Sequence, residues 1–135
     1  MRSIFVNLPV ADVGVSRSFF SALGFTFNDQ FSDDSTACLV IEENIFAMLM
    51  TPVRFADFVN GDIADASRTT EVLLALSADS RDEVDRLVST AIATGGKPWK
   101  PEQDHGFMYG GSFADPDDHV WEVVWMDPAT IAGQG

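Results

Sequence analysis

The stretch from Val6 to Phe25 reads VNLPVADVGVSRSFFSALGF and joins a strand to a helix. Residues 4–10 are rich in strand formers, and Asp12 stands immediately before the helical segment. Apolar side chains then recur at helical spacing, at Val15, Phe19, Phe20 and Leu23. Gly24 is suited to end the helix, because glycine accepts the left-handed backbone found at helix C-termini. The stretch therefore predicts a β-α unit whose helix presents one apolar stripe.

Three further strands complete this first module. They are predicted at residues 25–27, 37–41 and 45–50, with a turn at 42–44 between the last two. After them, Thr51 and Pro52 are typical of a helix start, and Gly61 ends the segment. We expect a short connector helix here, with Phe55 and Phe58 packing on the sheet or on a subunit partner.

The same order of elements recurs in the second half of the chain. Strands are predicted at residues 72–78, 97–101, 109–113 and 120–126. The helix after the first of them begins with a capping sequence at residues 80–83, and its apolar stripe consists of Val84, Leu87, Val88 and Ile92. The predicted fold class is therefore α+β. One domain, 1–135, contains two tandem βαβββ modules, about 1–51 and 70–128, which form a curved mixed sheet with a central cleft and the helices outside.

The composition excludes several kinds of partner. Lys plus Arg is 8 and Asp plus Glu is 21, and the formal net charge of −13 repels phosphate backbones and anionic lipid heads. No apolar run approaches the roughly 18 residues of a membrane span. We therefore expect no nucleic acid and no membrane partner, and the strand-like N-terminus favours a cytoplasmic location. Cys38 is the only cysteine, so no intrachain disulfide can form, and its apolar surroundings predict a small buried residue.

Two motifs resemble those of the vicinal oxygen chelate superfamily, which includes glyoxalases, bleomycin-resistance proteins and dioxygenases. The stretch VNLPVAD, followed by Ser16, FF and LGF, is similar to the first-module signature of that family. The sequence FADPDDHVWE at residues 113–122 is similar to its final hairpin, with Asp118 in place of the usual glycine. More narrowly, the chain resembles a branch described as predicted lactoylglutathione lyase-related proteins. The resemblance implies a small-molecule ligand.

The resemblance also implies where metal ligands would stand. Metal-dependent members take one ligand from the first strand and one from the last strand of each module. The corresponding positions here are Phe5, Met48, Leu73 and Glu122. Divalent metals of this kind need His nitrogen or carboxylate oxygen, and only Glu122 offers one. We therefore expect no metal and no cofactor, and no ordinary glyoxalase or extradiol dioxygenase chemistry.

Side chains two positions apart on a strand share a face, which predicts the lining of the cleft. Its apolar residues are Phe5, Met48, Met50, Leu73 and Val124, and the polar groups expected to converge there are Asn7, Glu71 and Glu122. Trp121 and Trp125 alternate to the opposite side, toward a helix or a partner. Tyr109 either donates a hydrogen bond to the ligand or packs. Two carboxylates in an apolar cleft repel, which raises the pKa of one and makes Glu122 or Glu71 a candidate general base.

Three functions remain open at this point. The first is a small-molecule-binding protein without the usual metal site, working as a metal-independent lyase or isomerase. The second is sequestration of a drug-like ligand, as in bleomycin-resistance proteins. The third is a module with a vestigial pocket. We also expect a homodimer, because the two outward tryptophans and the connector phenylalanines together present more apolar surface than one small domain easily covers.

Overall fold

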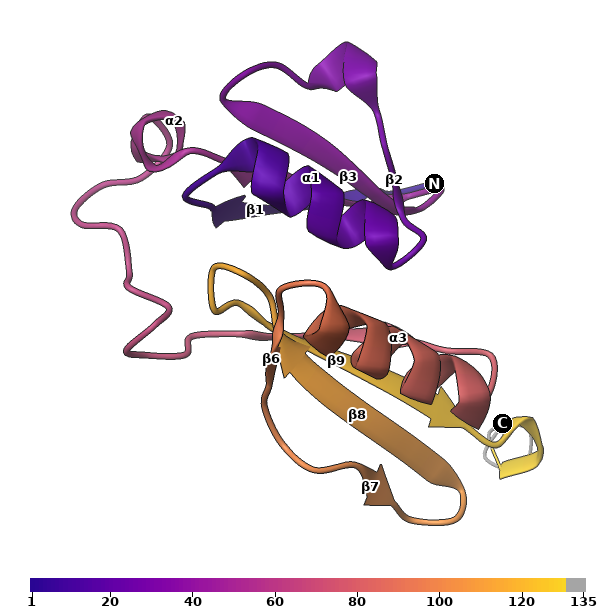
Figure 1. Cartoon of the computed structure of the whole chain (residues 1–135). Helices are drawn as coiled ribbons and strands as arrows, with labels where there is room; N and C mark the ends of the chain where they lie inside the picture. Colours follow the sequence, from indigo (N-terminus) through magenta and orange to yellow (C-terminus); the bar gives the residue numbers. More distant parts are fainter. Residues whose placement is uncertain (131–135) are drawn as a thin grey trace. The chain divides into compact units, whose positions relative to one another are not determined.

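The structure of the protein is a computed structural model that describes residues 1–130 (Figure 1). These residues form two compact units, one from Met1 to Asp65 and one that begins at Ala66. The end of the predicted 1–135 domain, residues 131–135, lies outside the described residues. Each unit contains the order β-α-β-β-β, which confirms the predicted α+β fold class.

The first unit is a four-stranded mixed sheet with one long helix. Its strands are β1 (Ile4–Pro9), β2 (Thr26–Phe27), β3 (Thr36–Glu42) and β4 (Ile45–Met50). Its helices are α1 (Val13–Ala22), the single 3-10 turn η1 (Asp29–Phe31) and the short α2 (Pro52–Ala56). The strand order is β1-β4-β3-β2, with β1 parallel to β4 and the other pairs antiparallel. The turn η1 was not predicted from the sequence.

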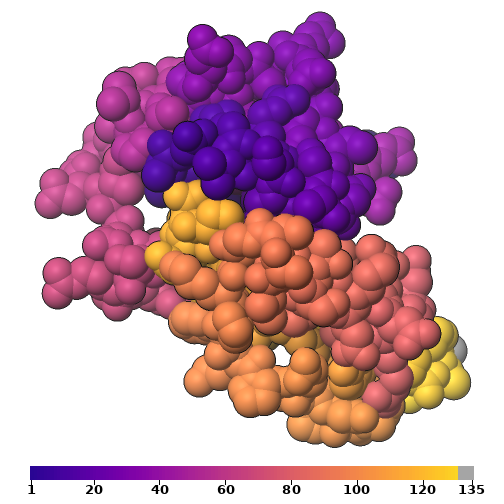
Figure 2. All heavy atoms as spheres, viewed as in Figure 1, coloured from indigo at the N-terminus to yellow at the C-terminus, as the bar shows by residue number. Residues whose placement is uncertain are grey.

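Helix α1 covers one face of this sheet. Asp12 caps the helix by accepting a hydrogen bond from the backbone N–H of Val15 at 3.1 Å. The prediction that Val15 belongs to the buried stripe is wrong, because its side chain is 51% exposed and Ser16 is 1% exposed in its place. Ser16 with Phe19 and Phe20 keeps the i, i+3, i+4 spacing of a buried helix face. In the space-filling view, the atoms of α1 form part of the near surface of this unit (Figure 2).

The second unit repeats the design of the first. Its elements are β5 (Leu73–Ser77), α3 (Arg81–Ala93), β6 (Lys97–Pro98), β7 (Gln103–Asp104), β8 (Met108–Ala114) and β9 (Val120–Met126). The strand order is β5-β9-β8-β6, and the short β7, which was not predicted, also pairs with β8. As in the first unit, the first strand is parallel to the last. The duplication inferred from the sequence therefore extends to strand order and direction.

Helix α3 lies very close to its sheet. A Cβ atom added to Gly111 on β8 would lie 2.9 Å from Cγ2 of Val88 on α3, so only glycine fits there. The predicted stripe of α3 contained Ile92, but this side chain is 40% exposed, and Ala91 is fully buried instead. Ala91, and not Ile92, continues the i, i+3, i+4, i+7 spacing set by Val84, Leu87 and Val88, so it is the residue that faces the sheet.

The turn between β8 and β9 is fixed by one buried carboxylate. Asp115 is 1% exposed, and its Oδ1 accepts hydrogen bonds from the backbone N–H groups of Asp117 at 2.9 Å and His119 at 3.0 Å. Its Oδ2 accepts a hydrogen bond from Nε1 of the buried Trp121 at 3.0 Å. Burial raises the pKa of Asp115, while nearby His119 and these hydrogen bonds act to lower it. Asp118, which stands in place of the usual glycine, adopts the left-handed conformation with φ of 68°, which aspartate tolerates better than most residues.

Replacing Asp115 by Asn should destabilise the second unit by about 1–3 kcal/mol. The amide oxygen of Asn can still accept the two backbone N–H groups, but its NH₂ group would face the Trp121 Nε1–H, leaving a buried donor without an acceptor. Urea denaturation followed by tryptophan fluorescence measures the loss. The matched control is Asp118→Asn in the same turn, which breaks only the exposed ion pair with Lys97 and should cost less than about 1 kcal/mol. Equal costs for the two variants would contradict this role of Asp115.

Candidate functional site

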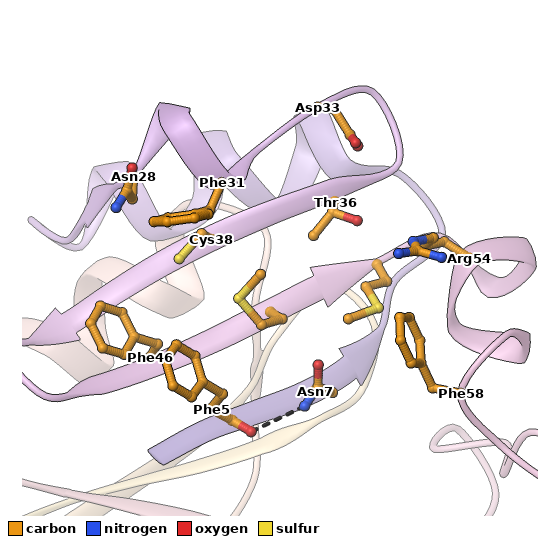
Figure 3. A pocket seen from close by; sticks show the side chains of 12 residues that line it. Phe5, Asn7, Asn28, Phe31, Asp33, Thr36, Cys38, Phe46, Arg54 and Phe58 are labelled. Atoms are coloured by element: carbon orange, nitrogen blue, oxygen red, sulfur yellow. Dashed lines mark hydrogen bonds between the residues drawn. The ribbon is translucent and has the colours of Figure 1, made fainter. Parts of the chain in front are cut away.

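The face of the first sheet opposite α1 carries a pocket of about 560 Å³. Its floor is formed by β1, β3 and β4, and its sides by residues of η1 and its flanking loops and of α2 and the turn after it (Figure 3). The lining residues are Phe5, Asn7, Asn28, Phe31, Asp33, Thr36, Cys38, Phe46, Met48, Met50, Arg54 and Phe58. All of them belong to the first unit.

The floor of the pocket is apolar because one set of alternate side chains on each strand points there. Phe5 of β1 stands opposite Phe46 of β4, and their rings stack with centroids 4.9 Å apart and an interplanar angle of 10°. Further along β4, Met48 stands opposite Cys38 of β3. The other alternate set on β4, represented by Ala47 and Leu49 with no exposed surface, faces the core. Period-two alternation thus separates a buried face from a ligand-accessible face.

Two further phenylalanines flank the floor. Phe31 belongs to η1, which Asn28 caps by accepting the N–H of Gln30 at 3.0 Å. Phe58 follows α2, which Thr51 caps as predicted by accepting the N–H of Arg54 at 3.3 Å. Both rings are strongly exposed, Phe31 at 62% and Phe58 at 60%. They offer apolar surface that a ligand could cover.

Five of the twelve lining residues have polar side chains, and two of these, Asn7 and Arg54, lie beside the apolar floor. The side-chain amide of Asn7 donates to the backbone carbonyl of Phe5 at 3.1 Å, which leaves its carbonyl oxygen directed into the pocket (Figure 3). The Arg54 guanidinium donates to Asp57 at 2.9 Å and lies 4.6 Å from the ring centroid of Phe58. A mostly apolar cavity with a small number of placed polar groups is typical of small-molecule sites.

The ionisable groups of the pocket are not set for proton transfer near neutral pH. Hydrogen bonds from the backbone N–H and the hydroxyl of Ser35 lower the pKa of Asp33, so this carboxyl is ionised at pH 7. Burial raises the pKa of the Cys38 thiol, which agrees with the buried, unreactive residue predicted from the sequence. The third such group, Arg54, is a permanent cation.

The second unit holds the remaining predicted site residues. Glu122 lies on β9 with Ala75 of β5 and Ser112 of β8 on either side, and it is half-buried. Leu73 is 52% exposed at the start of β5, and Glu71 is exposed in the segment before it. No described residue donates a hydrogen bond to the Glu122 carboxylate. Because Asn7 belongs to the first unit, its convergence with these carboxylates stays a prediction.

Tyr109 does not lie on the Glu122 face of its sheet. Its hydroxyl donates to Asp85 of α3, which raises the pKa of Tyr109 to about 12, and its ring lies 5.0 Å from the Arg81 guanidinium. The same guanidinium lies 5.1 Å from the ring of Trp125. The strand register therefore places Tyr109 on the side of α3, away from the Glu122 carboxylate. That Trp125 turns toward a helix is confirmed.

The four family ligand positions can be compared between the units through equivalent hydrogen bonds. The N–H of Val10 donates to Met50 at 2.7 Å, and the N–H of Ala78 donates to Val124 at 2.8 Å. Phe5 and Leu73 each stand five residues before the donor of their pair, so they are equivalent. Met48 and Glu122 each stand two residues before the acceptor, so they are equivalent as well. The alignment of the ligand positions therefore agrees with the structural repeat.

These positions do not fit a metal ion of the kind that the family binds. Phenylalanine and leucine have no donor atom, and a Met thioether is a poor ligand for hard or borderline metals. Glu122 alone supplies a carboxylate. Within residues 1–130, no group of three or more His, Cys, Asp or Glu side chains is placed to hold a metal.

Four of the predicted ligand-binding residues lie together in the first-unit pocket, namely Phe5, Asn7, Met48 and Met50. Sequence reasoning missed its other residues. Phe46 could have been found from its spacing to Met48 on one strand. Arg54 and Phe58 could not, because a connector of unknown path gives no register.

Residues 2–42 match a family model described as bleomycin resistance protein-like N-terminal. A search of curated proteins finds no match. No helix within residues 1–130 combines the length and the hydrophobicity that crossing a membrane requires.

Several solved structures are similar over nearly the whole chain. A hypothetical protein from S. aureus is 26% identical, with a TM-score of 0.79, over 93% of this chain and 94% of that one. A glyoxalase/bleomycin resistance protein/dioxygenase family enzyme from Burkholderia phytofirmans is 19% identical, with a TM-score of 0.72, over 90% and 96%. The fosfomycin resistance protein FosX from Listeria monocytogenes is 19% identical, with a TM-score of 0.64, over 93% of both chains. The N-terminal match and the shared fold agree with the resemblance to the vicinal oxygen chelate superfamily that the sequence motifs indicate.

Proposed function

We propose that this protein binds a small, largely apolar molecule with a flat ring in the first-unit pocket, without a metal ion. The observation that carries the proposal is the lining itself, which contains four phenylalanines and two methionines in a cavity of about 560 Å³. Cavities of roughly 300–1,000 Å³ with such linings are the usual sites of drug-sized ligands. The stacked rings of Phe5 and Phe46 provide a flat surface on which an aromatic ring can stack.

Binding without turnover is the leading form of this proposal. The pocket has no group with a pKa near neutrality that could act as a general base or a nucleophile. The family model matched by residues 2–42 is named for bleomycin resistance, and this segment contains more than half of the pocket residues. Both observations favour sequestration of a ligand.

A metal-independent lyase or isomerase is the second candidate function. The observation that favours it is Glu122, a half-buried carboxylate at a family ligand position on the sheet face opposite α3. Its neighbours across the sheet, Ala75 and Ser112, have small side chains. On this candidate, Glu122 acts as general base, and Glu71 remains a second carboxylate of the site.

The homodimer and the cytoplasmic location also remain proposals. Of the aromatic side chains first offered in support of a dimer, Trp121 is only 1% exposed and so offers no surface to a partner, whereas Phe58 is 60% exposed and lines the pocket. What supports self-association now is that β1 and β5 are the end strands of their sheets, which leaves one side of each open to pairing. A monomer in sedimentation at micromolar concentration would contradict the dimer.

Phe5→Ala should weaken binding of the neutral probe 2-naphthalenemethanol by about tenfold, or about 1.4 kcal/mol, measured by titration calorimetry. The variant removes one ring of the stacked pair, while stability should change little because Phe5 is 54% exposed. The matched control is Ile4→Ala, since Ile4 is 56% exposed on the same strand but points to the opposite face. The control should bind within about twofold of the unaltered protein. Equal losses in both variants would count against the pocket as the site.

Glu122→Gln tests the second candidate, because it keeps the shape of the side chain and removes its charge. If Glu122 belongs to a working site, the variant should stay folded and lose at least about tenfold in ligand affinity or turnover, or about 1.4 kcal/mol. The exposed Glu102→Gln of the same unit is the control and should change neither quantity. Unaltered affinity for 2-naphthalenemethanol in folded Glu122→Gln would remove Glu122 from the binding site.

A further inference from the structure

The pocket contains one cation, and it stands at the edge of the apolar floor. Arg54 lies on α2, and its guanidinium is held over the ring of Phe58, 4.6 Å from the centroid (Figure 3). The same group donates a single hydrogen bond to Asp57 at 2.9 Å. Phe58 and Asp57 therefore fix the guanidinium beside the space that a ligand would occupy.

Most of the hydrogen-bonding capacity of Arg54 is unused. A guanidinium has five N–H donors in a planar fork, and the contact with Asp57 uses one of them. This ion pair is exposed on both sides, with 45% of the Arg54 side chain and 61% of the Asp57 side chain accessible. Exposed ion pairs of this kind contribute little to stability, so the guanidinium is able to donate hydrogen bonds to a second anionic partner. The planar fork matches a carboxylate or a similar oxyanion in a bidentate arrangement.

We propose that the pocket selects aromatic anions, with the ring on the floor of Phe5 and Phe46 and the anionic group on Arg54. The inference rests on the proposed function and names the chemical class of its ligand. It makes Arg54 the residue that determines specificity. The side-chain carbonyl oxygen of Asn7 then accepts a hydrogen bond from a donor group elsewhere on the same ligand.

An organic cation is the opposite alternative, and the local geometry disfavours it. A ligand cation would have to share the edge of the pocket with Arg54, whose guanidinium already lies over the Phe58 ring. Asp33 is the only carboxylate in the lining, and it is exposed and already accepts two hydrogen bonds from Ser35. The net charge of −13 opposes an anion at long range, but salt screens such charges beyond about 8 Å at physiological ionic strength, whereas Arg54 would touch the ligand.

Three probes that share one ring test the proposal on the full chain. They are the anion 2-naphthoate, the neutral 2-naphthalenemethanol and the cation 2-(aminomethyl)naphthalene, titrated at pH 7 by calorimetry. We expect 2-naphthoate to bind at least about tenfold more tightly than the neutral probe, and the cation to bind most weakly. Equal or weaker binding of 2-naphthoate than of the neutral probe would overturn the inference while leaving the proposed function intact. Failure of all three probes to bind would overturn both.

Two variants of Arg54 assign the preference to its side chain. In Arg54→Gln, the ratio of the 2-naphthoate and neutral-probe affinities should fall to within about threefold. Arg54→Lys keeps the charge and should retain a preference for 2-naphthoate. A lysine variant that behaves like the glutamine variant would assign the effect to packing on Phe58 and overturn the proposal.

Arg17→Gln is the matched control. Arg17 also belongs to the first unit, pairs with Asp29 at 2.7 Å and lies 4.8 Å from the centroid of the Phe27 ring. It has the same two kinds of contact as Arg54, but it does not line the pocket. The affinity ratio in Arg17→Gln should equal that of the unaltered protein. A loss of preference in this control as large as that in Arg54→Gln would refute a specific role of Arg54.

Discussion

One long helix for each small sheet is the constraint on which the rest of this structure depends. In the first unit, α1 covers one face of the four-stranded sheet and buries Ala47 and Leu49 completely. The alternate residues, Met48 and Met50, must then point to the other face. No element of the first unit covers that face to the same extent, so apolar side chains remain available to a ligand. The pocket is thus a consequence of pairing one helix with a two-faced sheet.

The residues that depart from the family metal site are also residues that build the pocket. Phe5 and Met48 stand at two of the four ligand positions, and both belong to the lining. Metal-dependent members of the family have side chains at these positions that donate an electron pair to the ion. Phe5 and Met48 instead offer apolar surface, which stabilises a bound apolar group by about 25 cal/mol per Å² removed from water. The same two positions of the second unit hold Leu73 and Glu122, so the repeat is chemically asymmetric. The first unit is specialised for contact with an apolar ligand, and the second retains one carboxylate.

Sequence patterns predicted every strand except the two-residue β7, together with the main helices and their caps, because these depend on local spacing and local hydrogen bonds. The predicted buried stripes of α1 and α3 were wrong where a small residue is buried, because large apolar side chains were taken as the sign of burial. Ser16 and Ala91, rather than Val15 and Ile92, are buried because they continue the i, i+3, i+4, i+7 spacing of the other buried residues of their helices. For the site, the alternation of side chains along each strand predicted several pocket residues, including Phe5 and Met48. It could not find Arg54, because the path of a connector depends on tertiary contacts that no short pattern encodes.

Methionine-methyl NMR can test directly whether the ligand binds on the first sheet. Met48 and Met50 lie in the pocket, whereas Met108 and Met126 belong to the second unit. On titration with 2-naphthalenemethanol, ring currents should shift the Met48 and Met50 methyl signals in a saturable manner, and by more than those of Met108 and Met126. Unmoved Met48 and Met50 signals, or larger shifts at Met108 and Met126, would contradict this account.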